Sequence, residues 1–393
     1  MSTSTLPGDW TLSSLGQVCS FENGDRGINY PSPGSFVSIG VPFVNAGHLR
    51  AGGISLKSMD YITKEAFHRL GGGKFAPGDI LFCLRGSLGK FGVVDSETPI
   101  GAIASSLVII RPRPRDVAPD YLAAYLGSEL CAQQIEKWAG GAAQPNLGAG
   151  DLARFLLPLP PLAEQKKIAY ALADIDDLIT TLEQLAFKKR ALRQGLMQQL
   201  LTGRTRLPAF DRSWTARTLG ELANIKTGSR NNQDKTPGGL YPFFVRSATV
   251  ERIDSYSYDC EAILVPGEGG IGSIFHYIDG KFEVHQRVYK ISDFSAGVSG
   301  RFIYHFMRQF FGAHAMENSV KATVDSLRLP TLRNFAVQLP ELEEQAAIAA
   351  VLDTADDELE SLAHRLAKMR AIKTGMMQQL LTGRTRLPVE VAS

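Results

Sequence analysis

The residue types that carry most enzyme chemistry form no specific arrangement in this sequence. The histidines, among them His48, His68, His276 and His285, lack the spacing of metal ligands. There is no Walker A motif, no nuclease carboxylate–lysine cluster, no methyltransferase cofactor loop and no recognisable nucleophile triad. The sequence therefore predicts a chain without a catalytic site, a metal or a cofactor of its own.

One glycine-rich stretch does match a nucleotide-binding pattern. Gly267–Gly272, GEGGIG, satisfies the dinucleotide fingerprint G-x-G-x-x-G. Such a turn should open a helix inside a βαβ unit. Here Ser273–Tyr277 has the character of a strand, and the matching segment earlier in the chain keeps only Gly86 and Gly89. We therefore interpret GEGGIG as a tight turn and not as a nucleotide site.

Polar and basic residues in the loops are the stronger functional candidates. Arginine, lysine, asparagine and glutamine on loops suit contacts with phosphates and with the edges of bases. For any single residue, an ordinary solvated loop position remains the alternative; the set gains weight because it lies where two halves of the chain differ. The candidates are Arg26, Asn29, Tyr30, Asn45, His48, Arg85, Ser87, Lys90, Arg230, Asn231, Asn232, Lys235, Arg246, Ser247, His285, Gln286 and Arg287.

The chain contains an internal repeat that must position these loops. Gly195–Pro208, GLMQQLLTGRTRLP, returns almost unchanged at Gly375–Pro388, 180 residues later. A second match joins Trp10–Gly16 to Trp214–Gly220, which open the two globular regions. Repetition at a fixed period identifies a structural unit. The repeated unit is therefore a globular region followed by a long helix.

Each long helix carries a seam of apolar residues. Proline precedes Leu162 and Glu341, as at many helix starts, and Gly203 and Gly383 are expected C-caps. A helix from Leu162 to Leu201 would be roughly 60 Å long. Heptad spacing over several turns predicts that the two helices pair, and we expect them to run antiparallel. The seams comprise Ile168, Leu172, Ile175, Ile179, Leu182, Ala186, Leu196 and Leu200, interrupted by Lys189 and Arg193, and Ile348, Leu352, Ala355, Leu359, Leu362, Leu366, Met369, Met376 and Leu380, interrupted by Lys373.

Both globular regions are predicted to be α+β, with short strands broken by glycine and proline. Strands are expected at Leu107–Arg111 and Arg287–Ile291, and helices at Pro119–Trp138 and Ser299–Met316. Segments expected to form strands match between the halves, whereas loops such as Asp25–Ser38 and Ser229–Leu240 do not. The predicted domains are residues 1–158, a helical spacer at 159–208, residues 209–338, and a second helical spacer at 339–388.

Composition limits the partners and the cellular compartment that the chain can have. The chain of 393 residues has a formal net charge of +2, so any phosphate contacts must come from local patches or from partner subunits. Its four cysteines show no CxxC pair, which favours a reducing compartment. No apolar run approaches a membrane span, and the first residues do not resemble a secretory signal. We expect a cytoplasmic protein.

Taken together, these motifs resemble the specificity subunits of type I restriction-modification systems. The resemblance lies in Leu157–Gln165, LPLPPLAEQ, its copy Gln338–Gln345, QLPELEEQ, the segment Gly78–Lys90, and the two Trp-x4-Leu-Gly openings. It covers essentially the whole chain. The resemblance implies two target-recognition domains and two antiparallel coiled-coil helices.

The family implies a non-catalytic subunit that binds double-stranded DNA with a bipartite target. Each domain would read one half-site, and the helices would set the unread spacer. Partners would be two methyltransferase subunits, which carry S-adenosylmethionine and methylate adenine, and restriction subunits. On this basis Arg230–Lys235 with His285–Arg287 would read one half-site, and Arg26–Tyr30 with Arg85–Lys90 the other. Three alternatives remain: a type IIB-like recognition subunit, a coiled-coil scaffold without a DNA role, and a catalytic methyltransferase.

Overall fold

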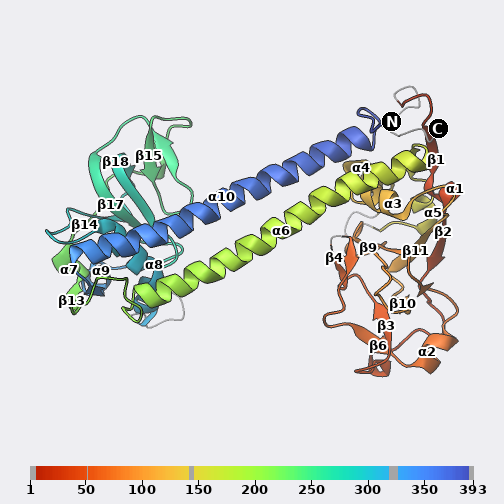
Figure 1. Ribbon diagram of the computed structural model, residues 1–393, viewed down its shortest axis with the longest axis horizontal. Helices are drawn as coiled ribbons and strands as arrows, with labels where there is room; N and C mark the ends of the chain where they lie inside the picture. Colours follow the sequence, from red (N-terminus) through yellow and green to blue (C-terminus); the bar gives the residue numbers. More distant parts are fainter. Residues whose placement is uncertain (1–5, 51, 141–145, 318–325, 389–393) are drawn as a thin grey trace. The chain divides into compact units, whose positions relative to one another are not determined.

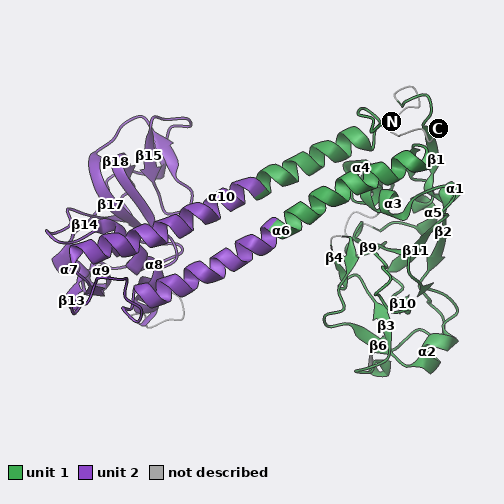
Figure 2. Ribbon diagram, viewed as in Figure 1, with its two compact units in different colours: residues 1–181, 366–393 green, residues 182–365 purple. Residues whose placement is uncertain are grey.

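The chain forms two compact units in the computed structural model, which describes residues 6–50, 52–140, 146–317 and 326–388. Unit 1 contains residues 1–181 and 366–393, and unit 2 contains residues 182–365 (Figures 1 and 2). Two helices of 39 residues, α6 (Leu162–Leu200) and α10 (Leu342–Leu380), contribute to both. Helix α6 begins in unit 1 and ends in unit 2, whereas α10 begins in unit 2 and ends in unit 1.

Unit 1 holds the first globular region, whose sheets are small. Its strands are β1 (Thr11–Ser14), β2 (Cys19–Asn23), β3 (Val41–Val44), β4 (Leu49–Arg50), β5 (Gly53–Ile54), β6 (Asp60–Ile62), β7 (Lys74–Phe75), β8 (Ile80–Cys83), β9 (Phe91–Val93), β10 (Gly101–Ile103), β11 (Leu107–Pro112) and β12 (Leu156–Leu159). They form sheets in the orders β6-β3-β10-β7, β2-β11-β8-β9, β1-β12 and β4-β5. The helices are α1 (Leu15–Val18), the 3-10 turn η2 (Pro33–Ser35), α2 (Lys64–Arg69), α3 (Pro119–Leu126), α4 (Glu129–Trp138) and α5 (Ala149–Leu152).

Unit 2 holds the second globular region, built on a larger sheet. Its strands are β13 (Thr215–Thr218), β14 (Asn224–Thr227), β15 (Tyr241–Phe244), β16 (Glu251–Ile253), β17 (Tyr258–Pro266), β18 (His276–Val284), β19 (Val288–Ser292) and β20 (Ala336–Leu339). Six of them form a sheet in the order β14-β19-β17-β18-β15-β16, and β13 pairs with β20. The helices are α7 (Leu219–Leu222), η3 (Asn232–Asp234), α8 (Gly300–Glu317) and α9 (Leu329–Arg333).

The core of each globular region is continuous with the ends of the long helices. In unit 1, Phe82 and Tyr121 are fully buried in the same cluster as Ile168 of α6 and Leu380 of α10. In unit 2, a matching cluster unites Ile263, Phe302 and Phe306 with Leu200 of α6 and Ile348 of α10. Burial of a large apolar side chain contributes about 1.5–3 kcal/mol. The helix ends are therefore integral parts of both cores.

The two helices run antiparallel within each unit. In unit 2, Lys189 of α6 binds Glu358 of α10 at 2.6 Å, and Arg206, just beyond the end of α6, binds Glu344 near the start of α10. Most of the predicted seam is buried, including Leu172 and Leu352. The predicted pairing is confirmed.

The charged interruptions of the seam are ion pairs between the helices. Lys189 binds Glu358, and Arg193 binds Asp356, both within unit 2. In unit 1, Lys373 binds Asp176 at 2.6 Å. A cation at a seam position is tolerated here because a carboxylate on the facing helix neutralises it.

A buried carboxylate joins the start of each long helix to the end of the other. Nε and Nη2 of Arg206 bind the two carboxylate oxygens of Glu344 at 2.6 and 2.7 Å, and the Trp214 indole N–H donates to the same carboxylate at 3.1 Å. The Glu344 side chain is fully buried. We call this group the helix-end clasp of unit 2.

Unit 1 contains the same clasp, made by the repeat-related residues. Arg386 binds both oxygens of Glu164 at 2.6 and 2.8 Å, and the indole of Trp10 donates to Glu164 at 3.1 Å. In both clasps the guanidinium lies 5.7 Å from the tryptophan ring centroid. The second arginine of each GRTRLP motif thus binds the glutamate of the other repeat, which accounts for the repetition of both motifs.

The glutamine that follows each glutamate anchors the globular region. Gln165 accepts a bond from the backbone N–H of Ala118 at 2.8 Å and donates to the Pro160 carbonyl at 2.9 Å. Gln345 likewise accepts from Ser299 N–H at 2.8 Å and donates to the Pro340 carbonyl at 2.8 Å. These bonds attach the helix start to the residue before α3 in unit 1 and to the residue before α8 in unit 2.

The expected caps are confirmed, and two expected elements are corrected. Gly203 and Gly383 have φ of +67° and +70°, the left-handed conformation that ends a helix. The helix expected at Pro119–Trp138 is two helices, because Gly127 ends α3 and the Ser128 hydroxyl caps α4. The strand expected at Ser273–Tyr277 begins only at His276, since the glycine-rich turn continues through Ser273. The turn leads into β18 and not into a helix, so it lacks the strand–turn–helix context of a dinucleotide-binding turn.

A short ladder closes each globular region next to its helix. β1 pairs antiparallel with β12, and β13 pairs antiparallel with β20. The first and last strands of each region are therefore neighbours.

Among the described residues, no helix is both long enough and apolar enough to cross a membrane.

The clasps should dominate stability at the helix ends. Replacing Arg206 by alanine leaves the buried Glu344 carboxylate with only the Trp214 indole, so we expect a loss of roughly 2–4 kcal/mol in the free energy of unfolding. The measurement is urea unfolding of R206A. R204A is the matched control, because Arg204 lies exposed in the same motif. Equal destabilisation by the two variants would contradict the role of the clasp.

Candidate nucleic-acid interface

In unit 1 the structure brings two of the candidate arginines together. Arg26 donates from Nη2 to the Ser105 carbonyl at 3.2 Å, and the Tyr30 hydroxyl accepts from Ser105 N–H at 3.4 Å. The loop after β2 is thus fixed against the segment between β10 and β11. Arg26 and Arg85 both line a hollow of about 410 Å³ beside Gly24. Two guanidiniums that line one hollow have the chemistry to bind an anion or the acceptor atoms of a base.

Two candidates in this unit build a turn. Asn45 accepts from Gly47 N–H at 2.8 Å and donates to Asp60 at 2.9 Å. His48 is buried, and its Nδ1 accepts from the Asn45 backbone N–H at 3.1 Å. The polar groups of Asn45 and His48 are therefore engaged in shaping the loop after β3.

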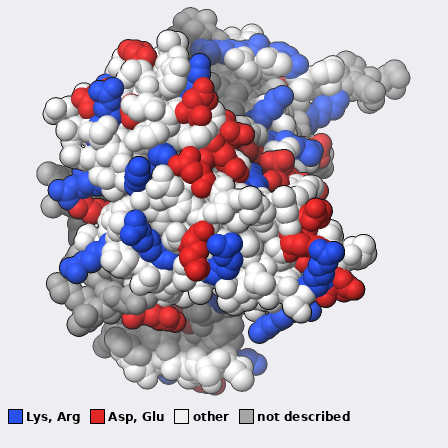
Figure 3. All heavy atoms as spheres, turned by 90° about the vertical axis from the view of Figure 1, so that its left-hand side faces the viewer, with Lys and Arg blue, Asp and Glu red and all other residues white. Residues whose placement is uncertain are grey.

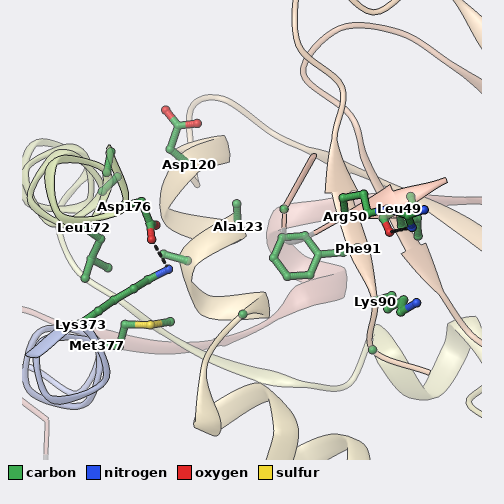
Figure 4. Close-up of a pocket in the computed structure, with 16 residues that line it drawn as sticks. Leu49, Arg50, Lys90, Phe91, Asp120, Ala123, Leu172, Asp176, Lys373 and Met377 are labelled. Carbon is green, nitrogen blue, oxygen red and sulfur yellow. Dashed lines mark hydrogen bonds and ion pairs between the residues drawn. The ribbon is translucent and has the colours of Figure 1, made fainter. Parts of the chain in front are cut away.

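The other candidates of unit 1 are divided between two places. Asn29 is exposed on the same loop as Arg26, and the Ser87 N–H bonds the Arg85 carbonyl at 3.0 Å. Lys90, by contrast, lines a cavity of about 610 Å³. Figure 4 shows this cavity, with Lys90 near Phe91 and the ion pair of Asp176 and Lys373 on the long helices at its opposite side.

In unit 2 the candidate residues from two separate loops form one continuous surface. Arg230 and His285 form a β-bridge, and Gln286 N–H donates to the Arg230 carbonyl at 2.8 Å. The Gln286 side-chain amide donates to Asn231 Oδ1. The His285 Nδ1 accepts from Arg287 N–H at 3.0 Å. The loop before β15 and the turn between β18 and β19 are therefore held together.

Glu268, which is not among the sequence candidates, completes this surface. Arg246, after β15, donates to Glu268 Oε2 at 2.9 Å, and Arg287 binds Glu268 Oε1. Hydrogen bonds from Arg246 and then Arg287 hold the pKa of Glu268 below its usual value, so the carboxylate is ionised at neutral pH. Glu268 lies in the GEGGIG turn. The unit-2 loop surface is defined here as Arg230, Asn231, Arg246, Glu268, His285, Gln286 and Arg287.

Sequence signals for Glu268 existed but were obscured by the glycines around it. It was the charged residue in a turn that matched the first-half segment containing Arg85.

His285 is the buried member of the surface. Burial, followed by the positive charges of Arg246 and Arg287, lowers the pKa of His285, so this ring is neutral at pH 7.

The remaining candidates of unit 2 have structural contacts of their own. Asn232 begins the η3 turn, and Lys235 binds Glu251 at 3.1 Å. The Ser247 hydroxyl donates to the Thr249 carbonyl at 3.0 Å. Figure 3 shows basic and acidic side chains intermixed over the face that it draws. Among the described residues on that face, the basic side chains form no single continuous band.

No group of three or more histidine, cysteine, aspartate or glutamate side chains is arranged to hold a metal ion in the part of the chain that the structure describes. The unit-2 loop surface offers guanidinium and amide donors and one carboxylate acceptor. These groups suit contacts with the phosphates and the base edges of a nucleic acid.

Arg230 should be needed for folding as well as for any contact with a ligand. Its Nε lies 3.3 Å from Oε2 of Glu283, whose side chain is fully buried. In R230A the Glu283 carboxylate keeps only two uncharged donors, the Ser257 hydroxyl and the Val284 N–H. We therefore expect a loss of roughly 1–3 kcal/mol in the free energy of unfolding. K235A is the control, because Lys235 and Glu251 form a pair that is partly exposed on both sides. Thermal unfolding of both variants tests this, and an unchanged midpoint for R230A would refute it.

Comparison with known proteins identifies the family. The model "Type I restriction modification DNA specificity domain" matches residues 7–189 and 211–369. The EcoDI specificity subunit of Escherichia coli is 32% identical over 43% of this chain and 37% of its own length, and the MjaVIII specificity subunit of Methanocaldococcus jannaschii is 22% identical over 97% and 94%. The crystal structure of the type I system S subunit from M. genitalium has a similar fold, with a TM-score of 0.68, 16% identity and coverage of 97% of this chain and 98% of that one. The chain therefore belongs to the family of type I restriction-modification DNA specificity proteins.

Proposed function

We propose that this chain is the specificity subunit that reads a bipartite DNA target for a type I restriction-modification enzyme. The observation that carries the proposal is one scaffold present twice with different polar loops. Both units share the helix-end clasp, the closing ladder and the glycine-rich turn. Arg26 and Arg85 meet at one hollow in unit 1, whereas Arg246, Glu268 and Arg287 meet in unit 2. Two different surfaces on one scaffold suit two different half-sites.

The chemistry of modification belongs to partner subunits. Specificity subunits of type I systems are non-catalytic. We propose that two methyltransferase subunits dock on this chain, bind S-adenosylmethionine and methylate a flipped adenine, and that restriction subunits join this core. The net charge of +2 fits this division, because the partners would supply many of the phosphate contacts.

Other assemblies make different predictions. A type IIB-like complex would cleave on both sides of the target. A scaffold without a DNA role would show no sequence-specific, salt-dependent binding in the assembled complex. A catalytic chain would bind S-adenosylmethionine without partners.

Exchange of one globular region tests independent reading. Replacing residues 215–339 by the equivalent region of a relative should change one half of the methylated site and leave the other half intact. The ends of this exchange lie in the β13–β20 ladder, so the clasp residues Arg206, Trp214 and Glu344 are all retained. Methylated adenines are mapped across the genome of a host that expresses the complex.

The matched control is exchange of the region between β1 and β12, residues 11–159, which should change only the other half-site. If either exchange altered both half-sites in an active complex, or neither, independent reading would be wrong.

We further propose that the length of the paired helices sets the spacer between the half-sites. Insertions belong within the helices, because residues 201–208 carry the Gly203 cap and Arg206 of the clasp. Four helix-forming residues added after Thr181 and four after Arg365 lengthen both helices by about 6 Å, nearly two base pairs at about 3.4 Å each. The two half-sites should persist while the spacer grows by one or two base pairs.

Methylome sequencing reports the spacer directly. Insertion into α6 alone is the control; it shifts the seam against an unchanged α10 and should impair assembly. An active double-insertion complex that retained the original spacer would rule out this role of the helices.

A further inference from the structure

The glycine-rich turns of the two units share three backbone features, although Gly270, with φ +67°, has no left-handed counterpart at Ser87. The Leu84 carbonyl accepts from Leu147 N–H at 3.0 Å, and the Gly267 carbonyl accepts from Leu327 N–H at 2.8 Å. Two residues after each carbonyl comes a left-handed glycine, Gly86 with φ +78° and Gly269 with φ +69°. A second left-handed glycine follows three residues later in both turns, at φ +83° and +74°. The residue between each carbonyl and the first glycine therefore occupies an equivalent position.

The charge at that position is reversed between the units. In unit 1 it is Arg85, which is exposed and shares its hollow with Arg26. In unit 2 it is Glu268, which lies between Arg246 and Arg287. The same carbonyl hydrogen bond and left-handed glycine flank this position in both units, and the side chain that the position presents differs. An arginine offers donors to its ligand, whereas a glutamate offers acceptors.

Glu268 retains the capacity to bind a further donor. One carboxylate oxygen accepts from Arg246 and the other from Arg287, and an ionised carboxylate provides about four acceptor positions. The side chain of Glu268 is 28% exposed, and that of Arg287 is 55% exposed. Both groups can therefore meet a ligand at the surface. An acceptor next to guanidinium donors matches the major-groove edge of a G·C pair, where cytosine offers its amino group and guanine offers O6 and N7.

We propose that Glu268 is a specificity-determining residue that accepts a hydrogen bond from a cytosine amino group, while Arg287 donates to the guanine of the same base pair. Arg246 then holds the carboxylate in position. This assignment rests on the proposed function, and it predicts a G·C pair in the half-site read by unit 2. The corresponding position of unit 1, Arg85, presents donors and so reads different chemistry in the other half-site.

The test measures base preference position by position. The assembled methyltransferase complex carrying E268A is incubated with DNA in which each position of the target is varied in turn. We expect preference for one G·C pair, in the unit-2 half-site only, to fall roughly 5- to 150-fold. R212A is the matched control, because Arg212 is a surface residue of unit 2 outside the loop surface; its preference should equal that of the unaltered complex. R85A should alter base preference only in the half-site that unit 1 reads.

E268Q separates reading from structure, because it keeps the size of the side chain and removes its charge. Relaxed preference at the same base pair in E268Q, with an unchanged melting temperature, would support the assignment. A uniform loss of affinity for all sequences would show that Glu268 only positions the arginines and would overturn the proposal, as would an unchanged preference in an active E268A complex. If the unaltered complex preferred no sequence at all, the proposed function itself would fail.

Discussion

A buried carboxylate bound by an arginine from the other repeat is the contact on which each unit depends. Glu164 and Glu344 lie in the first turn of their helices, where the helix dipole favours negative charge. Removing these charges from water is costly, and a two-pronged arginine contact with a tryptophan donor offsets that cost. Each arginine comes from just beyond the end of the opposite long helix. The contact therefore fixes three things together: where one helix starts, where the other ends and where the globular region begins.

The separation of scaffold from surface follows from this contact. Trp10 and Trp214 open the globular regions, and their indoles bind the clasps. Gln165 and Gln345 attach the helix starts to backbone N–H groups at the entries of α3 and α8. These bonds use side chains whose identity cannot change without leaving buried polar groups unsatisfied. The loops beyond the strands take no part in the clasps, so they can differ between the units without disturbing them.

The two units also differ in the side chains that lie beside the long helices. In unit 1, Ala123 and Ala124 of α3 and Gly127, which follows the helix, line the cavity shown in Figure 4. In unit 2, α8 carries Tyr304 and Arg308, and the Arg308 guanidinium lies 5.2 Å from the Tyr304 ring centroid. Small side chains of α3 line the cavity in unit 1, whereas Tyr304 and Arg308 line a hollow of about 400 Å³ beside α8 in unit 2. Repetition of the backbone thus does not impose repetition of its surfaces.

The sequence by itself determined the repeat, the long helices with their seams and glycine caps, and the α+β character of the two globular regions. Heptad periodicity, proline and left-handed glycine act through local geometry, so they can be recognised without the fold. It did not determine the roles of Arg206 and Arg386, because their partners lie 138 and 222 residues away. Nor could it distinguish Asn45 and His48, which shape a turn, from Arg246 and Arg287, which meet at Glu268. Whether a polar residue supports a loop or faces a ligand depends on which loops the sheet brings together, and only the tertiary structure decided that.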